Sequence, residues 1–248
     1  MILLKSPREI ELIRESGRIV GQAIQLARES ARPGLTTGEL DVILEEFVVS
    51  QAARPAFKGF RGFPASTCIS VNEVVVHGIP GNRRLKEGDI VSVDIGVEKN
   101  SYYGDGAVTF GIGSISAQAS DLLATCQQAL TAGIEMAKVG GRLSDISHAV
   151  QSFTESRGFN VVRDLVGHGI GKQMHEDPQV ANFGPPGKGP RLQAGMTLAI
   201  EPMITVGHYA VVTLEDNWTL ATADGSLAAH WEHTVAITDE GPLILTRG

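Results

Sequence analysis

An acidic residue within an apolar segment recurs at the same place in the two halves of the chain. Gly88 precedes Asp94 by six residues, and Gly195 precedes Glu201 by six residues. Each acid interrupts an apolar run that predicts a strand, Val-Ser-Val-Asp-Ile in the first half and Leu-Ala-Ile-Glu-Pro in the second. A carboxylate in such a run is costly unless it is paired or bound to a cation. The repeat predicts two similar halves that face each other, each donating acids to a central site.

The first acid belongs to a predicted β-hairpin. Residues 91–97 alternate apolar and polar side chains, which is typical of a half-buried strand, and Asp94 lies near its centre. The turn-rich segment 98–101 follows, and a second apolar run opens at Asp105. A hairpin would bring the two carboxylates together, and a shared metal ion would relieve their repulsion. An alternative stays open, in which Asp94 ends its strand and Asp105 lies in a solvated turn.

Two helices are predicted ahead of the strands in each half. Ser6 and Glu9 form a capping box, and Thr36 with Glu39 forms a second, so helices begin after Ser6 and after Thr36. In the second half, apolar spacing predicts one helix over about 117–138 and another that stops at Gly158.

Strand-like runs follow each pair of helices, after a loop at 54–66 in the first half. Besides the hairpin, the predicted strands span 67–77 with a turn at 72–73, 160–163, 196–200 and 234–237. The repeated order of helices followed by strands is that of an α+β fold. Because no linker rich in proline, serine or charge separates the halves, the chain is expected to form a single domain over residues 1–248, with pseudo-repeats of about 1–113 and 114–248.

Composition excludes several classes of protein. A formal net charge of −7 argues against a nucleic-acid-binding protein, which usually shows a basic face. The two cysteines, Cys68 and Cys126, exclude a thiolate zinc site and fit a reducing compartment. The apolar start is too short for a signal peptide, and no apolar run reaches membrane-spanning length. The sequence predicts a cytoplasmic monomer with no membrane partner and no specific nucleic-acid partner.

A histidine joins the acids in the second half. Segment 167–171, Gly-His-Gly-Ile-Gly, matches neither a dinucleotide-binding nor a phosphate-binding motif. Its glycines would instead allow a close approach between the backbone and a neighbouring group at His168. Carboxylate and imidazole together suit a divalent transition metal. Four acids carry too much charge for one ion but suit two divalent cations bridged by acids and a hydroxide. The candidate ligands are Asp94, Asp105, His168, Glu201 and Glu232.

These residues lie in motifs that resemble those of the type I methionine aminopeptidases. The matching segments are Thr-Cys-Ile-Ser-Val-Asn-Glu-Val-Val-Val-His-Gly-Ile-Pro at 67–80, Gly-His-Gly-Ile-Gly at 167–171, His-Glu-Asp-Pro at 175–178, Ala-Ile-Glu-Pro-Met at 199–203 and Glu-His-Thr at 232–234. The resemblance runs from about Ser6 to the C-terminus, and the chain is expected to be the short bacterial form of the family, without an N-terminal zinc-binding extension.

The resemblance implies a fold and an activity. The fold is the pita-bread fold, in which two pseudo-symmetric halves form a central antiparallel sheet covered by helices. The activity is the removal of the initiator methionine from the N-termini of nascent polypeptides, and association with the ribosome would suit it.

The resemblance also implies a role for each ligand. Asp94 would chelate one metal ion, and His168 and Glu201 would complete the other site. Asp105 and Glu232 would bridge the two ions. Cobalt, manganese, iron and zinc all suit such a site, so the identity of the metal stays open.

Three catalytic residues follow from the same resemblance. A hydroxide held between the metal ions would attack the first peptide carbonyl, and Glu201 would move the proton. His175 would stabilise the developing oxyanion, and His77 would contact the scissile amide.

An apolar pocket for the methionine side chain is implied as well. Phe60 and Phe63 stand where the family usually has tyrosine, and Met174 stands where phenylalanine is common. All three are apolar, so an unbranched thioether should fit, and each sulfur–aromatic contact is favourable by roughly 0.3–1.5 kcal/mol. The implied substrate-binding residues are His77, His175, Cys68, Phe60, Phe63, Met174 and Trp218.

Other departures from the family pattern leave specificity and turnover open. Gly106 replaces a threonine, Ala228 a serine and His230 a glutamine, but none of these changes removes a ligand. Two alternatives to the leading hypothesis remain. One is another pita-bread peptidase, such as a proline-specific one, and the other is a divergent copy of low activity that binds peptides.

Overall fold

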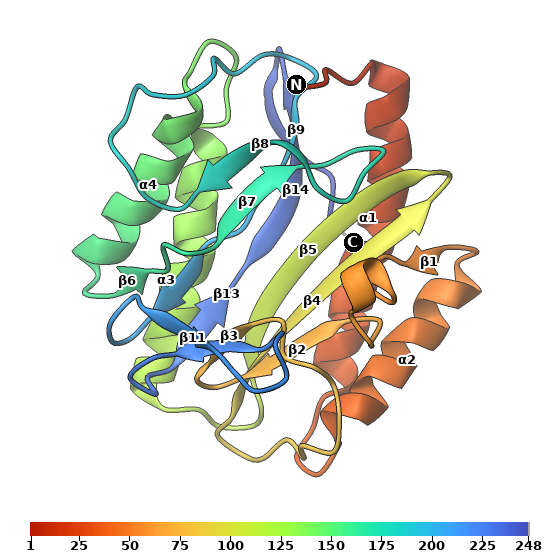
Figure 1. Ribbon diagram of the computed structural model, residues 1–248, viewed down its shortest axis with the longest axis vertical. Coiled ribbons are helices and arrows are strands. Elements are labelled where there is room, and N and C mark those ends of the chain that lie inside the picture. Colours follow the sequence, from red (N-terminus) through yellow and green to blue (C-terminus); the bar gives the residue numbers. More distant parts are fainter. Residues whose placement is uncertain (248) are drawn as a thin grey trace.

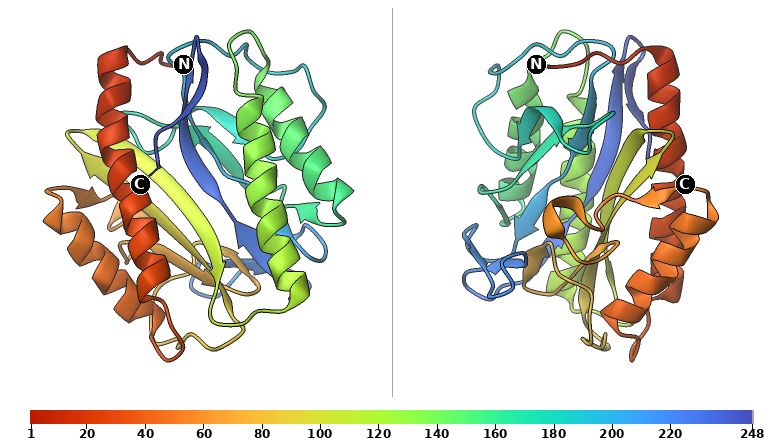
Figure 2. Two further views of the ribbon diagram at one scale, coloured as in Figure 1. Left: turned by 180° about the vertical axis from the view of Figure 1, so that it is seen from behind. Right: turned by 45° about the vertical axis from the view of Figure 1, so that its right-hand side comes forward.

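Four α-helices cover one face of a nine-stranded antiparallel sheet in the computed structural model, which describes residues 1–247 (Figure 1). Seen from behind, α1 and α3 cross the rear of the sheet and α2 and α4 lie toward its two sides (Figure 2). The helices are α1 (Pro7–Ser30), α2 (Thr37–Ser50), α3 (Ala117–Glu135) and α4 (Leu143–Ser156). Within residues 1–247, no helix is both long enough and apolar enough to cross a membrane.

Both predicted capping boxes are confirmed at the starts of α1 and α2. The Glu9 carboxylate accepts a hydrogen bond from the Ser6 backbone N–H at 2.9 Å. The Glu39 carboxylate does the same for Thr36 at 2.8 Å. Each box satisfies two backbone donors that a helix start would otherwise leave unpaired, and so fixes where the helix begins.

The large sheet joins strands from both halves of the chain. Its strands run in the order β1-β4-β5-β14-β9-β7-β8, with β2 paired to β4 and β15 paired to β14. Their bounds are β1 (Arg54–Pro55), β2 (Cys68–Val71), β4 (Ile90–Lys99), β5 (Tyr102–Gly111), β7 (Val166–Gly169), β8 (Glu176–Ala181), β9 (Thr197–Ile200), β14 (Glu232–Thr238) and β15 (Gly241–Ile244). The pairing of β5 with β14 makes the sheet continuous across the two halves.

Two small antiparallel sheets flank the large one. The first has the order β13-β10-β6, with β6 (Asn160–Val161), β10 (Met203–Thr205) and β13 (Ala228–His230). The second has the order β11-β12-β3, with β3 (Val74–Val76), β11 (Val211–Thr213) and β12 (Leu220–Thr222). The predicted strand 67–77 is therefore divided at its turn, with β2 in the large sheet and β3 in a small one. The predicted loop 54–66 contains β1 and a short 3₁₀ helix, Phe60–Gly62.

The predicted hairpin is confirmed, but its first strand is buried on both faces rather than on one. The apolar side chains of β4, Val91 and Val93 among them, pack against Leu40 and Leu44 of α2 in the main core. Each of these leucines contributes about 1.5–3 kcal/mol by its burial. The opposite face of β4 carries Asp94 and turns toward the side of the sheet that the helices leave free.

Candidate metal centre

The hairpin register places two acids on one face of the sheet. Asp94 of β4 lies opposite Ala107 of β5, and Asp105 lies opposite Gly96, so the two acids are diagonal neighbours. Asp105 is only 4% exposed, and Asp94 lies in the middle of its strand. The alternative of a strand-ending Asp94 and a solvated Asp105 is therefore wrong.

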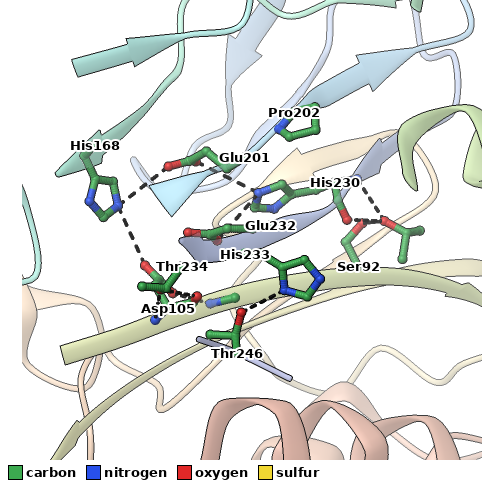
Figure 3. Close-up of polar contacts among 12 residues, drawn as sticks. Ser92, Asp105, His168, Glu201, Pro202, His230, Glu232, His233, Thr234 and Thr246 are labelled. Carbon is green, nitrogen blue, oxygen red and sulfur yellow. Dashed lines mark hydrogen bonds and ion pairs between the residues drawn. The ribbon is translucent and has the colours of Figure 1, made fainter. Parts of the chain in front are cut away.

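The second half brings a histidine and two more acids to the same place. His168 lies in β7, Glu201 follows the last residue of β9, and Glu232 is the first residue of β14. His168 Nε2 lies 3.7 Å from Asp105 Oδ2 and 3.6 Å from Glu201 Oε1. Figure 3 shows the imidazole between these two carboxylates, with Glu232 beside them.

The tautomer of His168 suits metal binding. Its Nδ1 lies 2.9 Å from the carbonyl oxygen of Gly169, which can only accept a hydrogen bond, so Nδ1 carries the proton. The lone pair of Nε2 therefore points at the acids and is free to bind a cation. Metal-bound histidines are oriented by this kind of second contact.

Several buried polar atoms of the cluster lack a hydrogen-bond partner within residues 1–247. They are Asp94 Oδ1, Glu232 Oε1 and His230 Nε2. Such atoms are costly unless something else satisfies them. Three of these side chains could bind one metal ion together, because each offers a ligand atom within 4.8 Å of the other two: Asp105, His168 and Glu232. The cluster therefore has the charge, the donor types and the unsatisfied atoms that a divalent cation requires.

Burial changes the protonation of the acids. It raises the pKa of Asp94 to about 7, against a hydrogen bond with Asp105 that lowers it. Burial, reinforced by the neighbouring carboxylates, raises the pKa of Asp105, Glu201 and Glu232 well above their usual values. Without a cation, the four carboxyl groups therefore share protons near neutral pH.

We expect Mn²⁺ binding to release protons and to tighten as the pH rises. The carboxyl groups must give up the protons that their raised pKa values retain, whereas burial lowers the pKa of His168, which is already neutral. Each released proton should raise the apparent affinity by about tenfold per pH unit until the acids have ionised. Calorimetric titrations between about pH 6 and 8, in buffers of different ionisation enthalpy, count these protons. An affinity that stays constant over this range would contradict the expectation.

Two further histidines lie beside the acids. The His175 ring stacks on Phe60 with the ring centroids 5.4 Å apart, and its centroid lies 4.1 Å from that of His168. Burial lowers the pKa of His175 to about 4, helped by the nearby Arg61 charge and by the repulsion that a second protonated imidazole at His168 or His77 would add. The His175 ring is therefore neutral at pH 7.

The backbone of His77 adopts a left-handed conformation, with φ of 57°. This costs about 1–3 kcal/mol in a residue other than glycine. The next residue, Gly78, allows the close approach that holds it, because a Cβ there would lie 2.3 Å from the carbonyl oxygen of Ile69. The conformation places the His77 side chain in the wall of the same cavity.

A cavity of about 280 Å³ contains the acids and most of the predicted pocket residues. Phe63 packs edge-on against Trp218, with the ring centroids 5.2 Å apart. Cys68 is buried, and its burial raises the pKa of its thiol, which is therefore neutral. The predicted residues in the wall are Phe60, Phe63, Cys68, His77, His175 and Trp218.

Met174 does not line this cavity, in contrast to the prediction. Its side chain is 3% exposed and packs over the backbone of the hairpin, with Met174 Cε only 2.9 Å from where a Cβ of Gly96 would lie. Because Gly96 has no side chain, the Met174 side chain can pack against the hairpin there instead of lining the cavity. Phe57 and Met203, which the prediction omitted, line the cavity instead. Met203 lies in a quoted motif and Phe57 in a loop rich in aromatic residues, but spacing alone does not show where they point.

The three other departures occupy different surroundings. His230 is 2% exposed, and its Nε2 lies 4.0 Å from Glu201 Oε2 and 3.9 Å from Glu232 Oε2. Gly106 leaves room for Val20 of α1, whose Cγ1 would lie 3.0 Å from a Cβ there. Ala228 donates its backbone N–H to the carbonyl of Asn72 at 2.9 Å. Of the three, only His230 faces the acids.

Comparisons with known proteins agree on one family. Residues 11–239 match the model of metallopeptidase family M24. The chain is 56% identical over 246 residues to the methionine aminopeptidase of Clostridium perfringens, covering 99% of each chain. It is 53% identical to methionine aminopeptidase 1 of Bacillus subtilis, covering all of both chains.

A solved structure extends this similarity to the fold. The structure of methionine aminopeptidase from Thermotoga maritima matches with a TM-score of 0.99 and 46% identity, and the match covers 100% of both chains. The expected pita-bread fold, a curled antiparallel sheet with four helices, is therefore confirmed. The chain belongs to metallopeptidase family M24 and, within it, to the type 1 methionine aminopeptidases.

Proposed function

We propose that the cavity removes the initiator methionine of nascent polypeptides with the help of two divalent cations. As a methionine aminopeptidase, the protein acts on polypeptide N-termini and releases their first residue. The observation that carries the two-cation proposal is the buried cluster of one imidazole and four carboxyl groups with unsatisfied oxygens. The proposed ligands are Asp94, Asp105, His168, Glu201 and Glu232.

The cluster divides naturally between two cations. Asp94 would hold one, while His168 and Glu201, which already lie within 3.6 Å of each other, would hold the second. Asp105 and Glu232 would bridge. Bound cobalt, manganese, iron or zinc would lower the pKa of a water molecule and polarise the peptide carbonyl.

The remaining chemistry falls to side chains of the cavity wall. Glu201 would accept a proton from the attacking water and pass it to the leaving amine. His175, neutral at pH 7, would donate a ring N–H to the developing oxyanion, as a fixed donor in a partly dry site does most effectively. His77, which lines the same cavity, would contact the scissile amide.

The apolar part of the wall accounts for the choice of methionine. The cavity wall beside the acids contains aromatic rings and a polarisable sulfur, from Phe60, Phe63, Trp218 and Cys68. A flexible thioether can adapt to such a surface and gains from contact with the rings. Phe57 and Met203 extend the same surface, and Met174 supports it from behind.

We propose that the whole chain, residues 1–248, works as one catalytic domain and as a cytoplasmic monomer. The sheet that β5 and β14 make continuous supports a single domain with pseudo-repeats of about 1–113 and 114–248. Its substrates emerge at ribosomes, so association with the ribosome would raise their local concentration. The two cysteines are unpaired, which fits a reducing compartment.

The test is metal-dependent cleavage of matched peptides. Purified protein is incubated with Met-Ala-Ser and with Ala-Pro-Ser, with added Mn²⁺ or Co²⁺ and with a chelator in parallel. We expect free methionine from the first peptide only, and none once the chelator is present. Cleavage of the proline peptide alone would favour the proline-specific alternative. Bound metal without cleavage would indicate altered specificity, whereas the absence of both metal and cleavage would favour a divergent peptide-binding copy.

A further inference from the structure

A buried ion pair joins the N-terminal segment to the loop that carries His175. Lys5 Nζ lies 2.6 Å from Glu176 Oε2, and the two side chains are 6% and 7% exposed. Every other pair between a lysine or arginine and a carboxylate within residues 1–247 has a partner that is at least 37% exposed. Exposed pairs contribute little, whereas breaking a buried pair has large effects.

Both partners are tied into the surrounding backbone. Lys5 N–H donates to the carbonyl of Gly195 at 2.7 Å, and its ammonium also donates to the carbonyl of Leu3 at 3.1 Å. The second oxygen of Glu176 accepts the N–H of Gln173 at 3.1 Å. The Glu176 carboxylate therefore connects the N-terminal segment to the loop two residues ahead of His175.

The atoms around the Lys5–Glu176 ion pair are closely packed. A Cβ at Gly171 would lie 2.6 Å from Lys5 Cε and 2.7 Å from Glu176 Oε1. The carbonyl of Gly171 in turn accepts the N–H of Tyr103 from β5 at 2.9 Å. The loop from Gly171 to Glu176 is thus held at both ends, on one side by the hairpin and on the other by the ion pair.

His175 depends on that loop for its position. Its ring has no hydrogen-bond partner among residues 1–247, and it stacks on Phe60 and lies against the ring of His168. A side chain that donates to an oxyanion must lie within hydrogen-bond distance of the place where that oxygen develops its charge. A displacement of the side chain by 1 Å can lower the rate by about 10².

We propose that the Lys5–Glu176 ion pair positions His175, by holding its loop where the imidazole can donate a hydrogen bond to the developing oxyanion. The inference rests on the proposed role of His175 and adds two residues that lie outside the cavity wall and outside the proposed ligand set. The charged pair acts through the loop backbone, so its removal should lower kcat with little change in KM.

The test is a double-mutant cycle between Glu176→Gln and His175→Ala, with metal content measured in every sample. We expect Glu176→Gln to lower kcat by about tenfold to 10²-fold in the wild-type background. In the His175→Ala background it should change kcat by less than about twofold, because there is no longer a donor to position. Equal losses in both backgrounds, or no loss in either, would overturn the inference.

Two further variants separate position from stability. In Lys5→Met/Glu176→Met the buried charges become apolar, a change that is often neutral or stabilising. We expect this variant to keep its melting temperature and still to show the lowered kcat, whereas full recovery of kcat with stability would overturn the inference. The matched control is Glu98→Gln, which breaks the exposed pair with Arg54 and should leave kcat unchanged.

Failure of the underlying role gives a different result from failure of the inference. If His175→Ala alone keeps full kcat, the proposed role of His175 is wrong, and its positioning by the pair is overturned with it. If His175→Ala loses activity but Glu176→Gln does not, only the positioning inference is overturned.

Discussion

Replacement of Glu201 by alanine is expected to remove both the bound metal and peptide cleavage. Glu201 Oε1 lies 3.6 Å from His168 Nε2, and its side chain is 14% exposed, so the carboxylate faces the cluster rather than the solvent. The variant loses a proposed metal ligand, which is also the group that we propose moves the proton. Proton transfer alone contributes about 10²–10⁴ in rate. We expect kcat/KM to fall by at least about 10³, which corresponds to about 4 kcal/mol.

Metal content and stability are measured on the same samples as activity. Because the variant has one fewer buried acid, the metal-free Glu201→Ala protein should be no less stable to heat than the metal-free parent. A loss of activity therefore cannot be attributed to unfolding if the melting temperature is kept. The matched control is Glu46→Ala, an exposed acid of α2, which should change neither metal content nor rate. Full turnover in Glu201→Ala would refute the assignment.

Replacement of His175 by alanine is expected to lower kcat by about 10²–10³ while the metal stays bound. This is the loss seen when one donor to an oxyanion is removed from a preorganised site. His175 lies next to His168 but outside the proposed ligand set, so metal content should not change. Its pKa is lowered to about 4, so the ring keeps one N–H at higher pH and the loss should be constant between about pH 5 and 9.

His148→Ala is the matched control for this prediction. His148 is exposed on α4, and its replacement removes an imidazole without touching the cavity. A loss of kcat below tenfold in His175→Ala would show that His175 does not stabilise the oxyanion. A loss that appears only below about pH 5 would show that a charged imidazole is required instead.

The parts of the fold that the sequence predicted well are those whose causes are local. The two capping boxes fix the starts of α1 and α2, and the turn at 98–101 with its flanking alternation fixes the hairpin. The end of α3 was placed a few residues too late, because the chain tightens where Met136 N–H donates to the carbonyl of Gly133. Nothing in apolar spacing distinguishes that tighter turn from one more helical turn.

The candidate site was found through residue types and motifs, and its finer structure depends on contacts between distant residues. Lys5 and Glu176 are 171 positions apart, and no local pattern marks them as partners. The family resemblance places Met174 in the pocket, but its side chain instead packs over Gly96, where there is no side chain in its way. In the sequence His230 is only a departure from the family pattern, and the strand pairing of β13 places its ring beside Glu201 and Glu232.

The pairing of β5 with β14 also orders events in time. A ribosome delivers the hairpin that carries Asp94 and Asp105 long before it delivers Glu232, which lies near the C-terminus and pairs with Ala107. Contacts between such distant segments form slowly, because the intervening loop must close first. A growing chain can therefore build half of the site early, but it completes the ligand set only when nearly all of it has been synthesised. Each copy must finish its own synthesis and capture its metal before it can trim the N-terminus of any other chain.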